Sequence, residues 1–419
     1  MNALMNSPLS VWAIAAASTL GVIVRPLKLP EAVWAVLGAL ALCCLGMLPW
    51  SEALHAIGSG TDVYLFLIGM MIASELARKE GLFDYLAALA AKRAAGSATR
   101  LFFLMYCVGT LVTVFMSNDA TAVVLTPAVL VVAQAVKAKN PLPYLYICAF
   151  IANAASFVLP ISNPANLVIF RDHMPTLGTW LAQFALPSAL SIVATYVVLR
   201  LMLRKPLAQK IEANVDVPRL SATGKMTGWG IIAMAAVMLA ASAFDVSLGI
   251  PTFSAGLALF IIICIQKRTF LSGHLAEISW TVLPLVAGLF VLVEGLQHTG
   301  VVDALAELLR CAAQHSAAHA AWWSGTAVAL ASNLINNLPA GLIAGSALAT
   351  AHAPTQVASA VLIGVDLGPN LSITGSLATI LWLNALRRHG VEVSAMTFLK
   401  LGIVVTLPAL AAALTAVLI

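Results

Sequence analysis

The chain has 419 residues, of which 61% are hydrophobic and only 9% are charged, with a formal net charge of +5. Because a soluble domain carries about 25% charged residues, this composition excludes an ordinary water-exposed surface. The apolar runs are continuous and do not alternate with polar residues, which excludes a transmembrane β-barrel and indicates a membrane protein built of helices.

Apolar stretches that can form membrane helices occur in two sets along the chain. The first set lies at about 9–24, 30–48, 62–77, 101–116, 120–136, 143–160 and 177–203. The second set lies at about 227–244, 251–266, 279–297, 321–333, 338–350, 356–385 and 395–418. The long polar segment between the sets divides the chain into a first membrane repeat at 1–203, a cytoplasmic linker at 204–225 and a second, inverted repeat at 226–419.

The two sets are related in sequence. Gly69 and Glu75 have counterparts in Gly288 and Glu294, and each pair is separated by 219 positions. Such a persistent register indicates an internal duplication.

The positions of the basic residues predict how the repeats cross the membrane. If the arms at 101–116 and 120–136 form a re-entrant hairpin and the N-terminus lies outside, 20 of the 22 basic residues fall in the cytoplasm, with Arg171 and Arg310 outside. A model of twelve spans moves Lys137 and Lys139 outside, so the positive-inside rule disfavours it. We predict an all-α polytopic membrane protein with two inverted-topology repeats, about ten transmembrane helices plus two re-entrant hairpins, and broken helices at the midplane.

Each half places two polar clusters at a depth where lipid excludes unpaired polar groups. One cluster occupies the hairpin turn, at 117–121 and 336–339, and the other interrupts a helix with proline and glycine, at 160–166 and 364–376. Broken helices of this kind are tolerated only against protein or a polar cavity, and in duplicate they are typical of secondary transporters. The alternative is that these side chains only hold helices together. The predicted substrate-binding residues are Asn118, Asn153, Ser162, Asn163, Asn166, Asn336, Asn337, Asn370, Ser372 and Thr374.

Two acids lie within these polar clusters. Asp119 and Asp366 have no basic residue nearby, and their matched positions in the other half are not acidic. Loss of hydration disfavours the charged form of such a carboxyl group, so it can exchange a proton at working pH. We predict that Asp119 and Asp366 couple transport to protons, with structural hydrogen bonding as the alternative. Glu75 and Glu294 are expected to stabilise helix ends.

Other classes of site find little support in the sequence. Cys311, His315 and His319 share one helix face, but the segment is predicted to be an outer interfacial helix, so we predict no bound metal. There is no P-loop, and we predict no catalytic residue and no cofactor. The basic residues flank membrane spans, so we predict the lipid bilayer as a partner and no nucleic acid.

The segments from Ser117 to Pro127 and from Gly364 to Thr379 resemble the arsenical pump membrane protein family of the ion transporter superfamily. The resemblance implies export of arsenite and antimonite, as neutral trihydroxides, from the bacterial cytoplasm in exchange for protons. It also implies a multi-pass protein of the inner membrane that works with or without a soluble arsenite-stimulated ATPase. With the predicted topology, both termini are then periplasmic; the oligomeric state is left open.

Related sodium-coupled carboxylate carriers use a Ser-Asn-Thr turn in each repeat, and this chain departs from that pattern. Its turns read Ser117-Asn118-Asp119 and Asn336-Asn337-Leu338. The departure disfavours sodium and suits a titratable carrier. The alternatives are a sodium/proton antiporter or another anion carrier of the superfamily, a passive channel, and an intramembrane aspartyl protease, whose signatures are not present before either acid.

Overall fold

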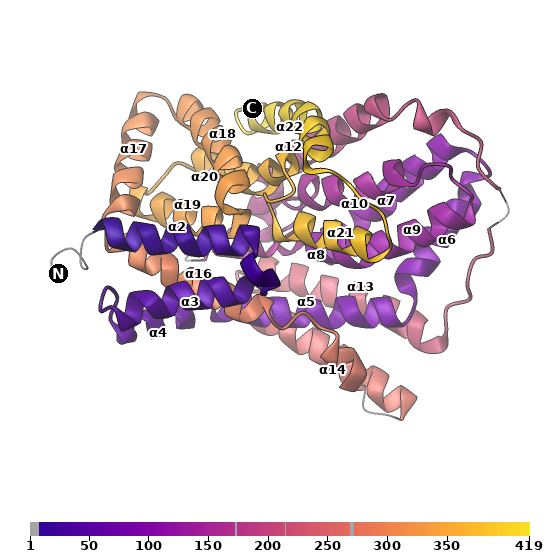
Figure 1. Cartoon of the computed structure of the whole chain (residues 1–419), viewed down its shortest axis with the longest axis horizontal. Helices are drawn as coiled ribbons and strands as arrows, with labels where there is room; N and C mark the ends of the chain where they lie inside the picture. Colours follow the sequence, from indigo (N-terminus) through magenta and orange to yellow (C-terminus); the bar gives the residue numbers. More distant parts are fainter. Residues whose placement is uncertain (1–7, 172–173, 214, 269–271) are drawn as a thin grey trace.

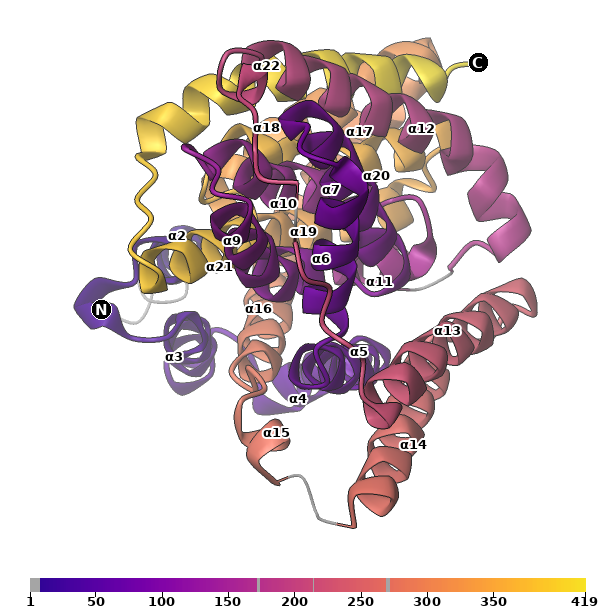
Figure 2. The same ribbon diagram turned by 90° about the vertical axis from the view of Figure 1, so that its right-hand side faces the viewer.

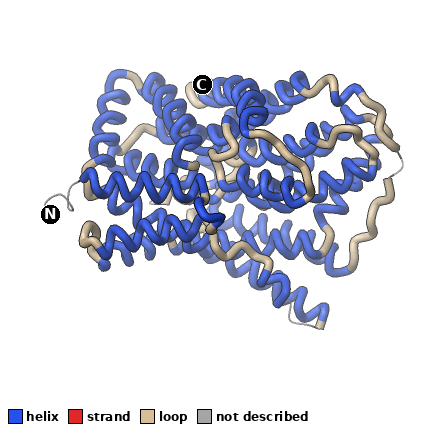
Figure 3. The backbone as a smooth tube through the Cα atoms, in the orientation of Figure 1, coloured by secondary structure: helices blue, strands red, loops and turns tan. Residues whose placement is uncertain are grey.

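The computed structural model describes residues 8–171, 174–213, 215–268 and 272–419. Within these ranges the fold is helical throughout, and the backbone forms no strand (Figure 3). An isolated antiparallel bridge joins Ser97 and Lys210. The structure therefore confirms the prediction of an all-α fold.

The elements of the first half follow the predicted apolar runs. They are α2 (Pro8–Val24), η1 (Pro26–Lys28), α3 (Glu31–Cys44), α4 (Trp50–Ser59), α5 (Thr61–Lys79), α6 (Leu82–Ala94), α7 (Ala98–Phe115), α8 (Asn118–Ala120), η2 (Thr121–Leu125), α9 (Thr126–Ala135), α10 (Leu142–Ala154), η3 (Pro160–Ser162), α11 (Pro164–Ile169) and α12 (Leu177–Met202).

The second half repeats this order after a short helix in the connecting segment. Its elements are η4 (Pro206–Ala208), α13 (Ala222–Ala243), α14 (Gly249–Lys267), α15 (Ser272–Ala276), α16 (Val282–Gln297), α17 (Val301–His315), α18 (Ala317–Ile335), α19 (Asn337–Ala351), α20 (Thr355–Leu367), η5 (Gly368–Leu371), α21 (Leu377–Arg388) and α22 (Ala395–Ala416).

Six continuous helical stretches among the described residues are long and apolar enough to cross a membrane. Two bent helix pairs, α4 with α5 and α16 with α17, raise this number to as many as eight. Three shorter apolar helices, α2, α3 and α10, come in addition. The protein is therefore polytopic, while the number of ten crossings stays a prediction.

Helices from the two halves pack reciprocally. In Figure 1, α2 and α3 lie with α16, whereas α13 and α14 lie with α5. In the order of elements, α16 in the second half corresponds to α5 in the first. Each of these two helices therefore packs against the first two helices of the other half. The last helix of each half, α12 and α22, lie side by side across the top of Figure 2.

Two glycines allow this reciprocal packing. A Cβ atom added to Gly69 on α5 would lie 2.3 Å from the backbone oxygen of Thr252 on α14. A Cβ atom added to Gly288 on α16 would lie 2.8 Å from the backbone of Ala35 on α3. Glycine lets helix backbones approach closely, as is common between membrane helices. The matched pair Gly69 and Gly288 therefore marks the same close crossing in both halves.

Each hairpin turn is fixed by a polar side chain that caps the returning helix. The Ser117 hydroxyl accepts a hydrogen bond from the Ala120 backbone N–H at 3.2 Å. The Asn336 side-chain oxygen accepts one from the Leu338 N–H at 3.3 Å, and Asn336 has a positive φ of 75°. These caps satisfy amide groups that a helix start leaves free.

The segment between α12 and α13 is tied to the ends of other elements. The Ile211 N–H donates to the Gly96 carbonyl at 3.2 Å, and the Glu212 N–H donates to the Val136 carbonyl at 2.9 Å. Gly96 lies between α6 and α7, and Val136 follows α9. The segment thus runs across one end of the first hairpin.

Candidate functional site

The first broken helix stops at α10 and restarts at α11. Pro160 and Pro164 lack a backbone N–H, so the helix cannot continue through them. The Asn166 side chain donates to the carbonyls of Ser156, Leu159 and Pro160 at 3.0, 3.3 and 3.3 Å. The Ser162 hydroxyl donates to the Val114 carbonyl at 2.9 Å. Asn166 and Ser162 thus satisfy buried groups at the break.

The second broken helix stops at α20, and η5 and an extended stretch precede α21. Ser372 donates from its hydroxyl to the Asn333 side-chain oxygen at 2.8 Å. The Thr374 hydroxyl donates to the Asn333 backbone oxygen at 3.3 Å. Asn333, on α18, in turn donates to the Gly368 carbonyl at 2.9 Å. The break is therefore held against the second hairpin by Asn333.

A small cavity of about 20 Å³ lies where the hairpin turns and the broken helices meet, and that volume holds about one water molecule. Four polar side chains line it, and the facing wall on α5 and α16 is apolar. The polar residues are Asn118, Asp119, Asn163 and Asn337, and the apolar wall is Val63, Leu67, Val282 and Val286. The remaining lining residues are Pro164, Leu338, Leu377 and Ala378.

The starts of four helical segments converge on this cavity. Asn118 begins α8, which continues through η2 into α9, and Asn337 begins α19. Pro164 begins α11, and Leu377 begins α21. Helix starts present free N–H groups and a partial positive charge. Caps already pair most of these N–H groups, so the helix starts contribute mainly their partial positive charge to the cavity.

Asp119 and Asp366 occupy different positions relative to the cavity. Asp119 lines it directly and is half-buried. Asp366 is fully buried and lies behind Asn163, whose side-chain nitrogen donates to Asp366 Oδ1 at 2.7 Å. The Asn163 side-chain oxygen accepts from the Ala165 N–H at 3.0 Å, which caps α11. Asn163 thus connects the buried acid to the cavity and to a helix start.

Several buried acceptor atoms lack a hydrogen-bond partner in the described part of the chain. They include Asn337 Oδ1 at the cavity and Asp366 Oδ2 behind it. Asn153 Oδ1 and Asn166 Oδ1 are also buried without a hydrogen-bond partner among the described residues. Because an unpaired buried acceptor is costly, such atoms point to a ligand, a proton or a water at the site.

The structure brings three of the predicted substrate residues, Asn118, Asn163 and Asn337, to the cavity and places the others around it. Asn153 donates to the Asn370 side-chain oxygen at 2.9 Å, and Asn370 donates to the Phe150 carbonyl at 3.0 Å. The predicted residues outside the cavity lining are Asn153, Ser162, Asn166, Asn336, Asn370, Ser372 and Thr374. Their contacts hold the two breaks together, so any role in substrate binding stays a prediction.

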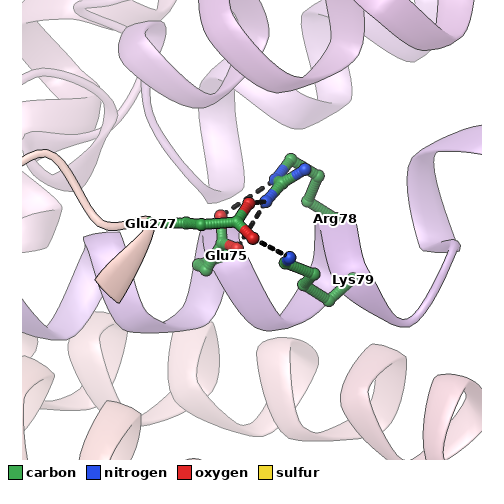
Figure 4. A network of polar contacts seen from close by, with 4 residues as sticks. All are labelled: Glu75, Arg78, Lys79 and Glu277. Carbon is green, nitrogen blue, oxygen red and sulfur yellow. Dashed lines mark hydrogen bonds and ion pairs between the residues drawn. The ribbon is translucent and has the colours of Figure 1, made fainter. Parts of the chain in front are cut away.

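Glu75 belongs to a separate polar network at the end of α5 (Figure 4). The Arg78 guanidinium donates to both oxygens of the Glu75 carboxylate, at 2.6 and 2.9 Å. Arg78 and Lys79 also pair with Glu277, which precedes α16. Glu75 therefore contributes to a structural ion-pair network that links α5 to the start of α16.

No group of three or more metal-ligating side chains occurs among the described residues. On α17, the Cys311 thiol lies 3.4 Å from Glu307 Oε1, and the His315 ring nitrogen lies 2.8 Å from the Cys311 carbonyl. These are contacts within one helix.

Sequence reasoning missed Asn333 and the apolar wall of the cavity. Asn333 stood within an apolar run and had no matched partner in the first half. The wall residues Val63 and Val282 are separated by 219 positions, as are Leu67 and Val286. The same spacing relates Gly69 to Gly288, so the internal duplication could have identified these wall residues from the sequence.

Comparisons with known proteins agree with this architecture. A family model described as citrate transporter matches residues 12–365. An arsenical pump membrane protein of Escherichia coli (strain K12) is 28% identical over 377 residues, covering 83% of this chain and 84% of that protein. An arsenical pump membrane protein of Yersinia enterocolitica is 27% identical over 369 residues, covering 83% of this chain and 84% of that protein. These relatives confirm the resemblance to arsenical pump membrane proteins.

A crystal structure of the Alcanivorax borkumensis YdaH transporter, described as having an unusual topology, shares the fold. Its TM-score is 0.61 at 15% sequence identity, and the match covers 96% of this chain and 97% of that one. At this level of identity the likeness bears on the fold alone.

Proposed function

The chain belongs to the citrate transporter family and is a membrane transporter, not an enzyme, and we propose that it exports arsenite and antimonite in exchange for protons. The similarity to arsenical pump membrane proteins supports this substrate class. The proposed location is the bacterial inner membrane, with both termini in the periplasm.

The polar wall of the cavity carries the proposal. Arsenous acid is a neutral triol, so it donates three hydrogen bonds and also accepts them. Asn337 Oδ1 is a buried acceptor with no partner in the described part of the chain, and Asp119 lies beside it. The side-chain amide groups of Asn118 and Asn337 supply donors for the oxygens of the substrate. This combination fits a small neutral hydroxide.

The same cavity argues against citrate as the substrate. None of its described lining residues is a lysine, an arginine or a histidine. A carboxylate, Asp119, lies there instead, and like charges repel strongly where water is scarce. A polyanion therefore lacks the cationic partners that it needs.

A second candidate is another anion carrier of the same superfamily, and the four helix starts around the cavity favour it. Their partial positive charge suits a small monovalent anion when Asp119 is protonated. A sodium/proton antiporter is the third candidate. An assay of which solute dissipates an imposed pH gradient, arsenite, another anion or sodium, distinguishes both candidates from arsenite exchange.

The unequal positions of the two acids support proton coupling. Asp119 lines the cavity, so its protonation competes with the acceptor role that the substrate needs. Asp366 influences the same cavity through its hydrogen bond with Asn163. We expect protons to bind from outside and to leave inside as the substrate moves outward.

The cavity must widen during the cycle, because a volume of about 20 Å³ is too small for a molecule with four heavy atoms. The cavity lies between α5 and α16 on one side and the hairpin turns and broken helices on the other. Movement of one side against the other is the expected form of alternating access.

The deciding experiment measures arsenite accumulation in everted vesicles that hold this protein alone, with an imposed pH gradient and no ATP. We expect uptake that collapses with the proton gradient and ignores sodium. Asp119→Asn is expected to abolish this uptake, whereas Asp303→Asn, on the exposed surface of α17, keeps it.

Two outcomes contradict the proposal. Unchanged uptake in Asp119→Asn contradicts the proton-carrier role. Sodium-dependent collapse of the gradient without arsenite uptake contradicts the substrate. Repeating the assay with antimonite, and with an arsenite-stimulated ATPase added, tests the remaining parts of the proposal.

A further inference from the structure

A second cavity, of about 250 Å³, lies beside the first. Segments from three parts of the chain form it: the start of α5, residues 170–171 and 174–175 after α11, and the connection between α13 and α14. Its polar lining includes Asp62, Arg171 and Asp245. We call this space the vestibule.

The vestibule lies on the predicted outer side of the membrane. Asp62 and Lys79 stand at opposite ends of α5, about 25 Å apart for a helix of this length. Lys79 belongs to the cationic residues that the positive-inside rule assigns to the cytoplasm, and Arg171 is one of the two basic residues assigned to the outside. The topology therefore places the vestibule at the outer end of the transport path.

We call the cavity where the hairpin turns and the broken helices meet the central cavity. Val63 lines both the vestibule and the central cavity. Its side chain is only 2% exposed, and it follows Asp62 in the first turn of α5. The Asp62 side-chain oxygen accepts a hydrogen bond from the Gly249 N–H at 2.8 Å, which fixes this turn against the start of α14. An apolar side chain held at this boundary keeps the two polar spaces apart.

The duplication gives Val63 a counterpart on the other side of the cavity. Val282 lies 219 positions further along the chain and lines the same cavity from the start of α16. In an inverted repeat, equivalent residues face opposite sides of the membrane. A residue at the outer boundary in one half is therefore matched by one at the inner boundary in the other.

We propose that Val63 is the outer gate of the central cavity, that the vestibule is its external mouth, and that Val282 is the equivalent inner gate. The assignment of a transport path rests on the proposed function. Exchange requires the gates to open in turn, so the bulk of each valine controls the passage between the cavity and one side of the membrane.

Thiol accessibility tests the outer gate without any substrate. Val63→Cys is made in a background in which the six native cysteines are serine. A membrane-impermeant cationic methanethiosulfonate is added to the outside of intact cells and, separately, to everted vesicles. Asp245→Cys at the exposed mouth serves as the accessible reference. Leu76→Cys, 1% exposed on the same helix near its cytoplasmic end, serves as the buried control.

We expect Val63→Cys to react from outside at least about tenfold faster than Leu76→Cys, because the gate opens toward the vestibule during the cycle. Equal rates for the two variants overturn the proposal. Reaction of Val63→Cys only in everted vesicles also overturns it, since the vestibule then faces the cytoplasm. Val282→Cys is expected to show the opposite sidedness.

Side-chain bulk provides a second test. Val63→Trp is expected to slow exchange at least about tenfold, whereas Val193→Trp, at a position 56% exposed on α12 and outside both cavities, stays within about twofold of the wild type. Equal rates for the two variants contradict the gate. The labelling result does not depend on arsenite. Labelling of Val63→Cys from outside without arsenite transport supports the gate and contradicts the proposed substrate. Arsenite transport without such labelling supports the substrate and contradicts the gate.

Discussion

The hydrogen bond between Asn163 and Asp366 yields a prediction whose magnitude can be worked from the structure. Asp366 is 0% exposed, and Asn163 donates to its Oδ1 at 2.7 Å. A hydrogen bond to a charged group contributes about 1.5–3 kcal/mol, against about 1 kcal/mol for a neutral pair. We expect Asn163→Ser to remove this bond and to lower the free energy of unfolding accordingly.

Serine is the informative replacement because it separates the two roles of Asn163. The Asn163 side chain also caps α11 through Ala165, and serine is an equally good cap. The shorter serine keeps the cap and loses the reach to Asp366. The measured loss therefore reports the bond to the acid.

A double-mutant cycle with Asp366→Asn isolates the charged part of the interaction. The amide still accepts from Asn163, so Asn163→Ser is expected to cost only about 1 kcal/mol in that background. The difference gives a coupling of about 0.5–2 kcal/mol, measured by unfolding in mixed detergent micelles at an alkaline pH that ionises Asp366. If the costs are the same in both backgrounds, Asn163 does not stabilise an ionised Asp366, and the proposed link between this acid and the cavity fails.

Three further predictions concern other parts of the fold. Gly69→Ala places a Cβ atom 2.3 Å from the Thr252 carbonyl and is expected to cost about 1–3 kcal/mol in unfolding assays, whereas Gly178→Ala, which meets open space on α12, is neutral or stabilising. Asn333→Ala removes the contacts to Ser372 and Gly368 and is expected to lower stability by about 1–3 kcal/mol and to slow transport; an unchanged melting temperature argues against its role in holding the break. Hydrogen bonds from Lys79 and Arg78 hold the pKa of Glu277 below its ordinary value of 4.5, so these ion pairs stabilise the fold above that pH and are lost as the pH falls through the lower folded value. The difference in melting temperature between the wild type and Glu277→Gln is therefore expected to be largest near neutral pH and to vanish in acid; a constant difference contradicts the assignment.

The sequence by itself determined the class of the protein, because composition and hydrophobic periodicity report directly on the solvent that a chain requires. It also predicted the polar clusters at the turns and breaks, since proline, glycine and asparagine at membrane depth demand special backbone. The matched Gly69 and Gly288 were visible as a duplication. Their physical role, the close crossing of α5 with α14 and of α16 with α3, required the packed structure.

Only the tertiary structure separated the two acids and completed the cavity. Asp119 and Asp366 look alike in sequence, because each sits in a polar cluster without a basic neighbour. Their difference depends on which side chain stands between the acid and the cavity, and that residue, Asn163, comes from another broken helix. Likewise, Val63 and Val282 are ordinary apolar residues in sequence. Their proposed role arises only because the packing of the two halves brings the starts of α5 and α16 to the same small space, a long-range arrangement that no local pattern records.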